Sequence, residues 1–554
     1  MKKLIVTLCF LIVLLANQSA QFEVYYGNEN GSCSGKALAT SVSRDGYLIV
    51  GHQSIDGSSH PYLLKTDLMG RSQWMKYFIT EDYSFYLRSI TPVENSLNGL
   101  PDGYAITGGV RHPGTTSAYD VFFLRVTKDG EPLYSKVYGN ERSDIGNVII
   151  PVYEEGKNTG FVIGGNSRRE FYEGDSYAYI IKTNEKGDLI RSIHVGNGNF
   201  HTCNGIASLS DGSYVFTGSS SQPCSDSSRR CADILVVKLK SNLSLQWSER
   251  IDITEADKVG DYGVSVGETR DHSIVLAGNT VELPRYYACW MKLDFSGRVL
   301  DFVKYRLPTV QDVTSMAITK GYKGQDVYAL TGYLEDYTDY EDVYVLNLNE
   351  DGKLNWDRMY GSEGFEVAPR IIKDFKDGFS LTGYVQDFDI TSGLNAFLMN
   401  LTADGKTNTQ CEYEYFPEVS SGNVNIIKGP EFFDVKYCEK VKTKVEKTKV
   451  DEYTCTGMPI TFPHRPFGTG MKAGETSDSP STVTLKNGTI EIEISELAGN
   501  NILRIYTLSG ILVHTVSLNQ SGLNKADLNM LANGIYLATI SDNHTSRSFR
   551  IVKE

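Results

Sequence analysis

The chain has 554 residues, of which 40% are hydrophobic, 11% aromatic and 22% charged. This balance supplies enough apolar material for several folded cores and excludes both a disordered chain and an integral membrane protein. The formal net charge of -14 disfavours nucleic acid as a partner.

The first 20 residues are typical of a secretory signal peptide. Two lysines precede the apolar run LIVTLCFLIVLLA, and the small residues Ser19 and Ala20 suit cleavage before Gln21. A retained membrane anchor is the alternative, but the run is short for a bilayer span. We therefore expect an exported chain with no transmembrane segment. Losing Lys2 and Lys3 with the peptide changes the formal charge from -14 to -16.

A short motif then recurs, as DGYLIVG at 45–51, DGYAITG at 102–108, DGSYVFTG at 211–218 and DGFSLTG at 377–383. An Asp-Gly turn followed by aromatic and β-branched residues predicts a hairpin strand. Aligning the chain on the final glycine of the motif gives seven copies: Gly51, Gly108, Gly165, Gly218, Gly278, Gly332 and Gly383.

Each copy continues with another apolar strand, near whose end stands Lys65, Arg125, Lys182, Lys238, Lys292, Asn347 or Asn400. The turn residue five positions later is glycine in six copies and Leu243 in the other, and a further strand with an aromatic residue often follows. One more strand precedes each Asp-Gly, so every copy has four strands, which we number in chain order from that preceding strand. Such units are stable around a ring, so we predict an all-β, seven-bladed β-propeller over residues 21–415. A linear β-solenoid is the alternative, although its repeats are usually shorter.

The repeats resemble the bacterial SBBP type of β-propeller repeat. The pattern D-x-x-x-x-K matches Asp120 to Arg125 and Asp233 to Lys238, and G-x-x-x-W-x-x-x-Y-G matches 352–361. This resemblance covers roughly residues 21–415 and implies a fold rather than an activity.

The ring also needs a strand that closes it. The segment VYYGN at 24–28 is similar to KVYGN at 136–140, which ends the outermost strand of another copy. We therefore expect the N-terminal segment to complete the seventh blade. The competing candidate is CEYEYF at 411–416.

Residues 416–480 are expected to form a linker or insert. They contain the lysine-rich stretch KVKTKVEKTKV at 440–450, which could bind a partner but is more typical of a solvated strand edge, and then a polar stretch with Pro, Gly and Ser.

Eight cysteines remain after signal-peptide cleavage, an even number that permits disulfides in an exported protein. We expect Cys224 to pair with Cys231 across the short polar loop CSDSSRRC, and Cys438 to pair with Cys455. The remaining connectivity is open. No C-x-x-C motif is present, so zinc binding and thiol redox chemistry have no support.

Residues 481–554 are expected to form seven short strands in a small immunoglobulin-like β-sandwich. The segments LRIYTLSGILVHT, LNMLANGIYLATI and RIVKE resemble the C-terminal sorting domain of the type IX secretion system of Bacteroidetes. The resemblance implies a partnership with the secretion machinery, passage through the periplasm and across the outer membrane, removal of the domain, and then attachment to the cell surface or release. The positions that match the family motif are Tyr506, Gly510, Leu531, Gly534, Tyr536 and Lys553.

Motifs for catalysis are weak. GVSVG at 263–267 matches G-x-S-x-G, but Ser265 falls in the expected innermost strand of the fifth copy rather than in a strand-to-helix turn. NLNEDG at 347–352 imitates a calcium loop, yet Arg358 stands where the last carboxylate ligand is required. We predict no catalytic residue, no metal site and no cofactor.

The loops between the second and third strands vary freely from copy to copy and should emerge on one face of the propeller. We therefore expect a surface or secreted binding protein with an unidentified protein or glycan ligand. The alternatives are a hydrolase or lyase that acts on glycan or peptide at the mouth of the propeller, and a structural surface component. The candidate ligand-binding residues are Tyr172, Tyr286, Tyr287, Tyr333, Asp336, Tyr337, Asp339 and Tyr340.

Overall fold

The computed structural model has only β-strands as its regular secondary structure in the residues that it describes, and the chain divides into two compact units, 1–461 and 462–554. In this described part, no helix is long and apolar enough to cross a bilayer. The structure describes residues 22–437 and 482–553, apart from segments 28–31, 56–57, 79–83, 112–118, 140–142, 169–175, 197–199, 224–229, 254–259, 283–284, 307–309, 322–323, 336–340, 361–364, 376, 387–393, 408–411, 414–417, 421–424, 429–433, 487–488, 495–500, 508–511, 519–521, 528–533 and 542–545.

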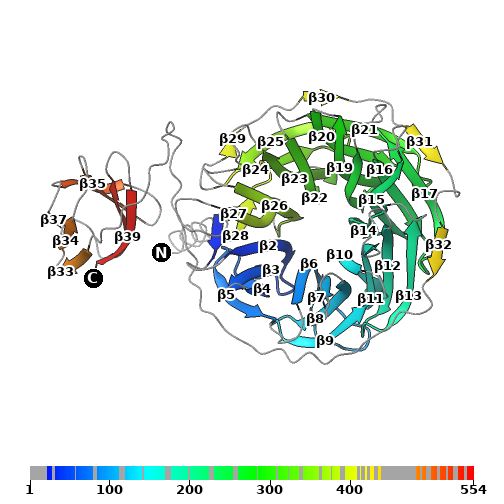
Figure 1. The fold of residues 1–554 in the computed structure, drawn as a ribbon, viewed down its shortest axis with the longest axis horizontal. Coiled ribbons are helices and arrows are strands. Elements are labelled where there is room, and N and C mark those ends of the chain that lie inside the picture. The colour runs from blue at the N-terminus through cyan, green and yellow to red at the C-terminus, as the bar shows by residue number, and fades with distance from the viewer. Residues whose placement is uncertain are drawn as a thin grey trace, which may run out of the picture. The chain divides into compact units, whose positions relative to one another are not determined.

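The first unit is a ring of seven antiparallel blades, which confirms the predicted seven-bladed propeller (Figure 1). Each blade starts at the central axis with an inner strand, and the next strands follow outward in chain order. From the first blade to the seventh, the inner strands are β2 (Cys33–Thr40), β6 (Ser84–Val93), β10 (Ser143–Glu154), β14 (Gly205–Ser208), β18 (Asp261–Glu268), β22 (Val310–Lys320) and β26 (Phe365–Lys373).

The outer strands of each blade repeat the same hairpin arrangement. The second strands are β3 (Tyr47–Ile55), β7 (Gly103–Arg111), β11 (Lys157–Arg168), β15 (Tyr214–Pro223), β19 (Ile274–Glu282), β23 (Asp326–Glu335) and β27 (Phe379–Gln386). The third strands are β4 (Ser58–Thr66), β8 (Tyr119–Thr127), β12 (Ser176–Asn184), β16 (Arg230–Leu239), β20 (Arg285–Leu293), β24 (Glu341–Leu348) and β28 (Asn395–Leu401). The fourth strands of the first six blades are β5 (Ser72–Tyr77), β9 (Pro132–Tyr138), β13 (Leu189–Gly196), β17 (Leu245–Asp252), β21 (Val299–Arg306) and β25 (Leu354–Tyr360).

The fourth strand of blade 7 comes from the N-terminal segment. Strand β1 (Phe22–Tyr26) pairs antiparallel with β28 along its whole length. The Tyr26 hydroxyl donates a hydrogen bond to the carbonyl of Gly70 in blade 1 at 2.5 Å, and Tyr138 makes the equivalent bond to Gly187 at 2.6 Å. The N-terminal segment therefore closes the ring, as predicted from its similarity to 136–140.

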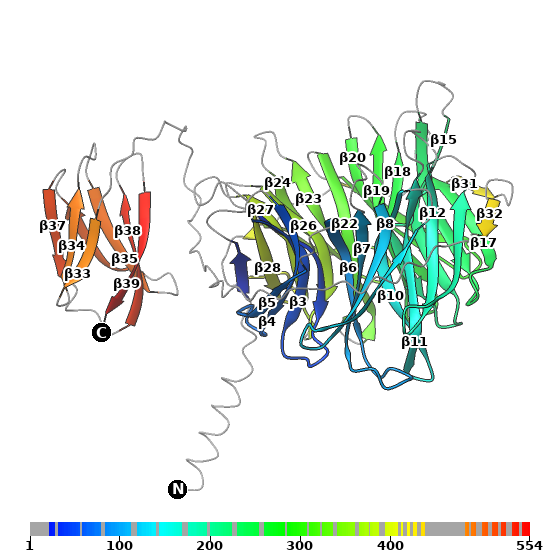
Figure 2. The ribbon, with the colours of Figure 1, turned by 60° about the horizontal axis from the view of Figure 1, so that its bottom comes forward.

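The chain that follows blade 7 runs back around the outside of the ring. Four short strands add a fifth strand to blades 6, 5, 4 and 3 in that order (Figures 1 and 2). The strand within 411–416, which was the competing candidate for closing the ring, pairs with blade 6 and does not complete blade 7. The linker or insert at 416–480 stays a prediction, and strands of two to four residues are too short to produce a sequence pattern. The lysine-rich stretch 440–450 lies outside the described residues. The four strands are β29 (Glu412–Tyr413), β30 (Glu418–Ser420), β31 (Asn425–Lys428) and β32 (Asp434–Tyr437).

The turns that follow the third strands use backbone with positive φ. Six of these turns place glycine there, with φ between 72° and 89°, and the turn of blade 4 places Leu243 there with a φ of 63°. Lysines of the third strand pair with the aspartate of the turn that precedes the second strand, at the same end of the blade. The three pairs are Lys65 with Asp45 at 2.9 Å, Lys238 with Asp211 at 2.8 Å, and Lys292 with Asp271 at 2.8 Å.

The seven repeat glycines lie in the second strands, where the inner strand comes unusually close. A Cβ on each glycine would lie within 3.0 Å of a carbonyl oxygen of the inner strand or of the residues just before it. In β2, β6, β10, β18, β22 and β26 the pairing skips one or two residues just after that carbonyl, which is a β-bulge. The glycine recurs because only a residue without a side chain allows this approach.

Large apolar side chains fill the space between neighbouring blades. Trp290 of blade 5 is fully buried and its ring centroid lies 5.5 Å from that of Tyr328 in blade 6. Because each blade buries both faces in this way, the ring is held together by side chains as well as by the closing strand.

The second unit contains seven strands in two sheets, and this number agrees with the expectation. The immunoglobulin-like packing of the two sheets stays a prediction. One sheet consists of β33 (Thr482–Lys486), β34 (Thr489–Ile494) and β37 (Gly522–Asp527), and the other of β36 (Leu512–Leu518), β35 (Asn501–Thr507), β38 (Gly534–Ser541) and β39 (Ser546–Lys553).

Candidate functional site

The bulges of the inner strands form a ring of residues around the central axis, which we call the bulge ring. A bulged residue has no direct partner in the strand ladder, so its side chain is free to serve another purpose. In blade 4 the equivalent residue immediately precedes β14. The members of the bulge ring are Lys36, Arg88, Asn147, Asn204, Val264, Thr314 and Pro369.

Polar members of the bulge ring hydrogen-bond to the next blade. Arg88 donates from Nη1 to Asn147 Oδ1 at 2.6 Å, and Asn147 in turn donates from Nδ2 to the carbonyl of Cys203 at 2.9 Å. Asn204 and Thr314 reach backbone carbonyls of blades 5 and 7 at 2.9 and 2.6 Å. The ring is therefore both a link between blades and a set of side chains whose type can vary.

The bulge ring lies near the end of the propeller that carries the variable loops, because the bulges come early in the inner strands and these begin beside the ends of the second strands. Every loop between a second and a third strand contains residues outside the described part of the chain. Five predicted ligand-binding residues fall there: Tyr172, Asp336, Tyr337, Asp339 and Tyr340.

The three other predicted residues lie within the described part. Tyr287 is only 6% exposed, and the Lys304 ammonium lies 4.7 Å from its ring centroid, so this side chain packs inside blade 5 rather than facing solvent. Tyr286 is half-buried on the same strand. Tyr333 lies at a pocket.

This pocket has a volume of about 330 Å³ and lies between blades 5 and 6. Its walls come from the inner and second strands of both blades and include Thr314 of the bulge ring. The lining residues are Tyr262, Asn279, Asp312, Val313, Thr314 and Tyr333.

The polar groups of the pocket are held in place by hydrogen bonds. Tyr333 donates its hydroxyl proton to Asp312 Oδ2 at 3.0 Å. Asn279 accepts from the Val313 N–H at 2.6 Å and donates to the Val313 carbonyl at 3.1 Å, which fixes the wall. Burial raises the pKa of Asp312, and the hydrogen bond from Tyr333 opposes this shift. Tyr262 is 38% exposed. The pocket thus offers an aromatic face, a carboxylate acceptor and a rigid backbone.

Of the residues that line the pocket, only Tyr333 is among the candidates predicted from the sequence, and Tyr262, Asn279, Asp312 and Thr314 are not. The repeat contains the signal that could have found them. Asn279 and Tyr333 each follow a repeat glycine, and Tyr262 and Asp312 each supply the carbonyl oxygen that approaches such a glycine. An alignment of the seven copies, position by position, would therefore have shown that these residues lie beside the repeat glycine or beside the bulge of the inner strand.

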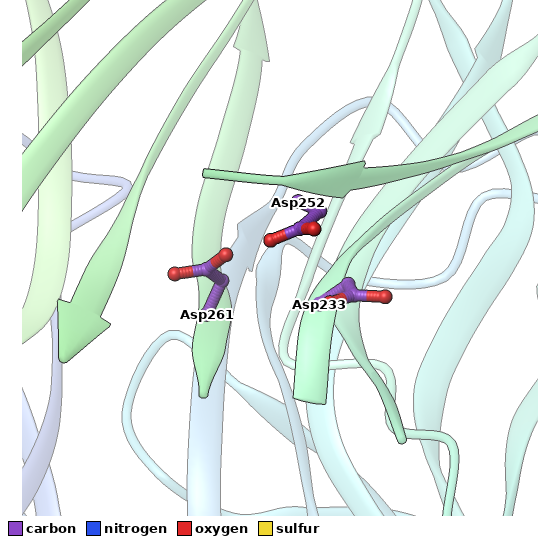
Figure 3. Close-up of side chains that lie close together, drawn as sticks. All are labelled: Asp233, Asp252 and Asp261. Atoms are coloured by element: carbon purple, nitrogen blue, oxygen red, sulfur yellow. The ribbon is translucent and has the colours of Figure 1, made fainter. Parts of the chain in front are cut away.

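A second polar cluster lies between blades 4 and 5, where Asp233, Asp252 and Asp261 come together (Figure 3). One carboxylate oxygen of each lies within 4.8 Å of the other two. Oxygen donors of this kind suit a hard cation such as Ca²⁺. The three residues come from β16, β17 and β18, which explains why no local motif revealed them.

The charge of this aspartate triad is offset by the protein itself. Arg250 Nε lies 2.6 Å from Asp233 Oδ2, and the Ile253 N–H donates to Asp261 Oδ2 at 2.7 Å. Burial raises the pKa of Asp261 to about 7 and that of Asp233 to about 6, and the charge of Asp252 adds to both shifts. Arg250 and a proton held by one of the carboxyl groups thus stabilise the triad. An acidic cluster by itself is not sufficient to assign a metal site.

The two weak motifs lie where the sequence placed them. Ser265 is in the inner strand β18, opposite Ala277, so G-x-S-x-G does not form a nucleophile elbow here. The turn of 347–352 connects β24 to β25, with Gly352 at a φ of 72° like the other turn glycines.

Four of the six sorting motif residues lie in one sheet of the second unit. Lys553 at the end of β39 pairs with Gly534 at the start of β38, and Tyr536 pairs with Thr507, the neighbour of Tyr506, on β35. Gly510 and Leu531 lie outside the described residues.

Comparison with known proteins identifies this unit. Residues 485–554 match the family of secretion system C-terminal sorting domains. This domain marks proteins that the type IX secretion system exports to the cell surface or the extracellular space, so the protein is a substrate of that machinery and is secreted or displayed on the surface. No curated protein matches the chain.

Two solved structures are similar to the chain at low scores. Sqt1 from Chaetomium thermophilum has a TM-score of 0.35 and 10% identity, over 67% of this chain and 84% of that one. The NanB sialidase from Streptococcus pneumoniae, in complex with 2-[(3-chlorobenzyl)ammonio]ethanesulfonate, has a TM-score of 0.36 and 12% identity, over 70% of this chain and 71% of that one. At these scores the likeness assigns neither ligand nor activity.

Proposed function

We propose that the protein is a secreted or cell-surface binding protein that recognises a protein or glycan at the loop end of its propeller, through the pocket between blades 5 and 6. The observation that carries the proposal is the lining of this pocket. Two tyrosines and the half-buried carboxylate of Asp312 line a space of about 330 Å³.

The chemistry of the lining favours a ligand with both apolar and hydroxyl surfaces. Tyr262 is partly exposed, so its ring can stack on the apolar face of a sugar or of a side chain. Asp312 receives one hydrogen bond from Tyr333, so its other oxygen can accept from a ligand hydroxyl or amide. Because the walls are fixed by Asn279, binding would cost little ordering of the protein.

A hydrolase would need a different set of residues in the same pocket. Hydrolysis of a glycosidic bond commonly uses two carboxyl groups that flank the bond. Among the described lining residues only Asp312 carries a carboxyl group. The single carboxylate supports binding over hydrolysis, and product formation from a bound glycan would favour the hydrolase or lyase instead. Absence of any ligand would favour the structural role.

The experiment is a glycan and protein array screen with the full-length protein, followed by affinity measurement on the best ligand. We expect Tyr262→Ala and Asp312→Asn each to weaken binding by roughly tenfold or more, as central contacts of an interface do. The matched control is Tyr153→Ala, because Tyr153 is 44% exposed and lies at the opposite end of a blade. Equal affinities for all three variants would contradict the proposed site.

The finer assignments rest on sequence and remain part of this proposal, namely SBBP-type repeats, a Bacteroidetes source, a cleaved signal peptide and two disulfides. The hairpin of β15 and β16 supports one of these assignments, because Pro223 pairs with Arg230 and the segment CSDSSRRC therefore spans the end of that hairpin. Cys224, Cys438 and Cys455 lie outside the described residues. Cys33, Cys203 and Cys289 are buried free thiols, so they take no part in the expected pairs. Mass spectrometry of the unreduced protein tests both disulfides.

A further inference from the structure

Three basic residues lie on the inner strands of three neighbouring blades, and none of them has an acidic partner among the described residues. Lys36 and Arg88 belong to the bulge ring in blades 1 and 2, and Arg370 follows the bulge in blade 7. Elsewhere in the described part of the propeller, lysines are commonly paired with carboxylates, as Lys136 is with Asp188 and Lys304 is with Glu282. This group of residues is therefore unusual for a chain with a net charge of -14.

Lys36 and Arg88 are close enough to affect each other. Burial lowers the pKa of Lys36, and the charge of Arg88 lowers it further. The Lys36 ammonium lies 4.7 Å from the ring centroid of Tyr384 in blade 7, and the Arg88 guanidinium lies 5.2 Å from that of Tyr86. The two rings attract the cations without neutralising their charge.

His52 lies beside the two cations and stays neutral. Its Nε2 accepts a hydrogen bond from the Leu87 N–H at 3.0 Å. Burial lowers its pKa to about 4, and the charges of Lys36 and Arg88 lower it in the same direction. At neutral pH the imidazole therefore adds no third positive charge, and its other nitrogen carries a proton that can be donated.

Arg370 lies at the junction of blades 7 and 1, where Lys36 contacts Tyr384. It is directly opposite Thr382 in the pairing of β26 with β27, and opposite residues of an antiparallel pair lie on the same face of the sheet. That face packs against blade 1, because a Cβ on Gly35 would meet Thr382 Oγ1 at 2.5 Å. Arg370 makes no hydrogen bond or ion pair in the described part of the chain, and burial lowers its pKa.

Neighbouring cations of like charge repel each other, and the half-buried Lys36 also loses hydration, so an anion between them would relieve both costs. We propose that Lys36 and Arg88 bind an oxyanion, the carboxylate, sulfate or phosphate group of a ligand at the central axis, and that Arg370 is a third cation of the site. This site goes beyond the proposed function, because it lies in blades 7, 1 and 2 and shares no residue with the pocket between blades 5 and 6.

The test uses inorganic sulfate as the probe, because it carries the proposed chemistry without any other contact. Sulfate binding to the full-length protein is measured by calorimetry and by thermal unfolding, with chloride at equal ionic strength as the reference. Acetate and phosphate in separate arms distinguish carboxylate from phosphate recognition. We expect sulfate to bind and to raise the unfolding temperature, and the substitutions K36Q and R88Q together to weaken binding at least about tenfold.

The matched control is the pair K353Q and K406Q, which removes the same two charges from exposed turns where each lysine has its own aspartate. It should bind sulfate like the parent protein. Loss of binding in the control as well would mean that only net charge matters and would overturn the proposal, as would unchanged binding in the K36Q and R88Q variant.

A single substitution guards against misfolding. Arg88 is exposed, so R88Q should fold and should still weaken sulfate binding several-fold. Tyr262→Ala should leave sulfate binding unchanged. If R88Q binds sulfate normally, the oxyanion site is refuted and the pocket between blades 5 and 6 is unaffected. If Tyr262→Ala and Asp312→Asn bind the pocket ligand normally, the pocket is refuted and the oxyanion site is unaffected.

Discussion

The two ends of the propeller are built from the same seven repeats, but the turn end has similar residues in most blades, whereas the loop end has residues that vary from blade to blade. At the turn end, six of seven blades place glycine at the same positive φ, and lysine pairs with aspartate in several blades. At the loop end, the repeat glycine is constant while the bulge ring beside it contains lysine, arginine, asparagine, valine, threonine and proline. Backbone geometry therefore dictates the constant positions, and the bulge releases a side chain from that constraint.

The sharpest way to break this comparison is to add a side chain at a repeat glycine. In Gly332→Ala the new Cβ would meet the Asp312 carbonyl oxygen, and it would lie 2.7 Å from the ring of the buried Tyr344. Neither group can move freely, so we expect a loss of unfolding free energy of about 3 kcal/mol or more, together with loss of the pocket wall. Urea unfolding and ligand binding measure the two effects.

The control for this prediction is Gly212→Ala, at a glycine with a φ of 78° and no atom within 4 Å of the added Cβ. It should lose only about 1 kcal/mol, the cost of the left-handed conformation. If both variants were equally stable, close approach would not be the reason for the repeat glycine.

The aspartate triad between blades 4 and 5 gives a pH-dependent prediction for the loop end. The carboxyl of Asp261 has a folded-state pKa of about 7, above its ordinary value of 3.8, mainly because of burial. The groups that face it are Asp233, Asp252 and the cation Arg250. Because the folded protein holds the proton more tightly than the unfolded chain, this contribution to stability is complete below pH about 4 and is lost as the pH rises through about 7.

We therefore expect Asp261→Asn to become more stable relative to the parent protein as the pH rises from 5 to 8, by roughly 1–3 kcal/mol. Urea unfolding of both proteins at several pH values measures this difference. A constant difference between them would mean that Asp261 is ionised throughout the range.

The closing strand can be compared with an ordinary outer strand through two tyrosines. Tyr26 and Tyr138 donate to equivalent turn carbonyls at 2.5 and 2.6 Å, and both are buried. We expect Tyr26→Phe and Tyr138→Phe to cost the same, about 1 kcal/mol each, because each leaves one buried carbonyl without its donor. Thermal unfolding compares them. A much smaller cost for Tyr26→Phe would show that β1 is held less firmly than a blade's own strand.

The same contrast between the two ends explains which features could be predicted from the sequence. Blade number, strand order and closure by β1 were predictable because glycine, turn and aromatic signals recur at fixed spacing and each has a local cause. The pocket itself was not predicted, and only Tyr333 of its lining was a candidate, since Asp312 and Tyr262 become neighbours only when two blades pack together. Tyr287 was mistaken for a surface residue because alternation along a strand does not show that both faces of a blade are covered.

The smallest expected effect concerns the one turn that lacks glycine. Leu243 has a φ of 63°, where any Cβ costs about 1–2 kcal/mol, yet its side chain is fully buried among the apolar residues of blades 3 and 4. Leu243→Ala keeps the strained backbone and loses the burial, whereas Leu243→Gly loses the burial and relieves the strain. The extra carbon removed in the glycine variant is worth only about 0.8 kcal/mol. We therefore expect both variants to be less stable than the parent protein, with glycine the more stable of the two by about 0.5 kcal/mol. Urea unfolding of the three proteins under identical conditions resolves the order. An alanine variant more stable than the glycine variant would mean that the turn of blade 4 has a conformation different from the six turns that contain glycine.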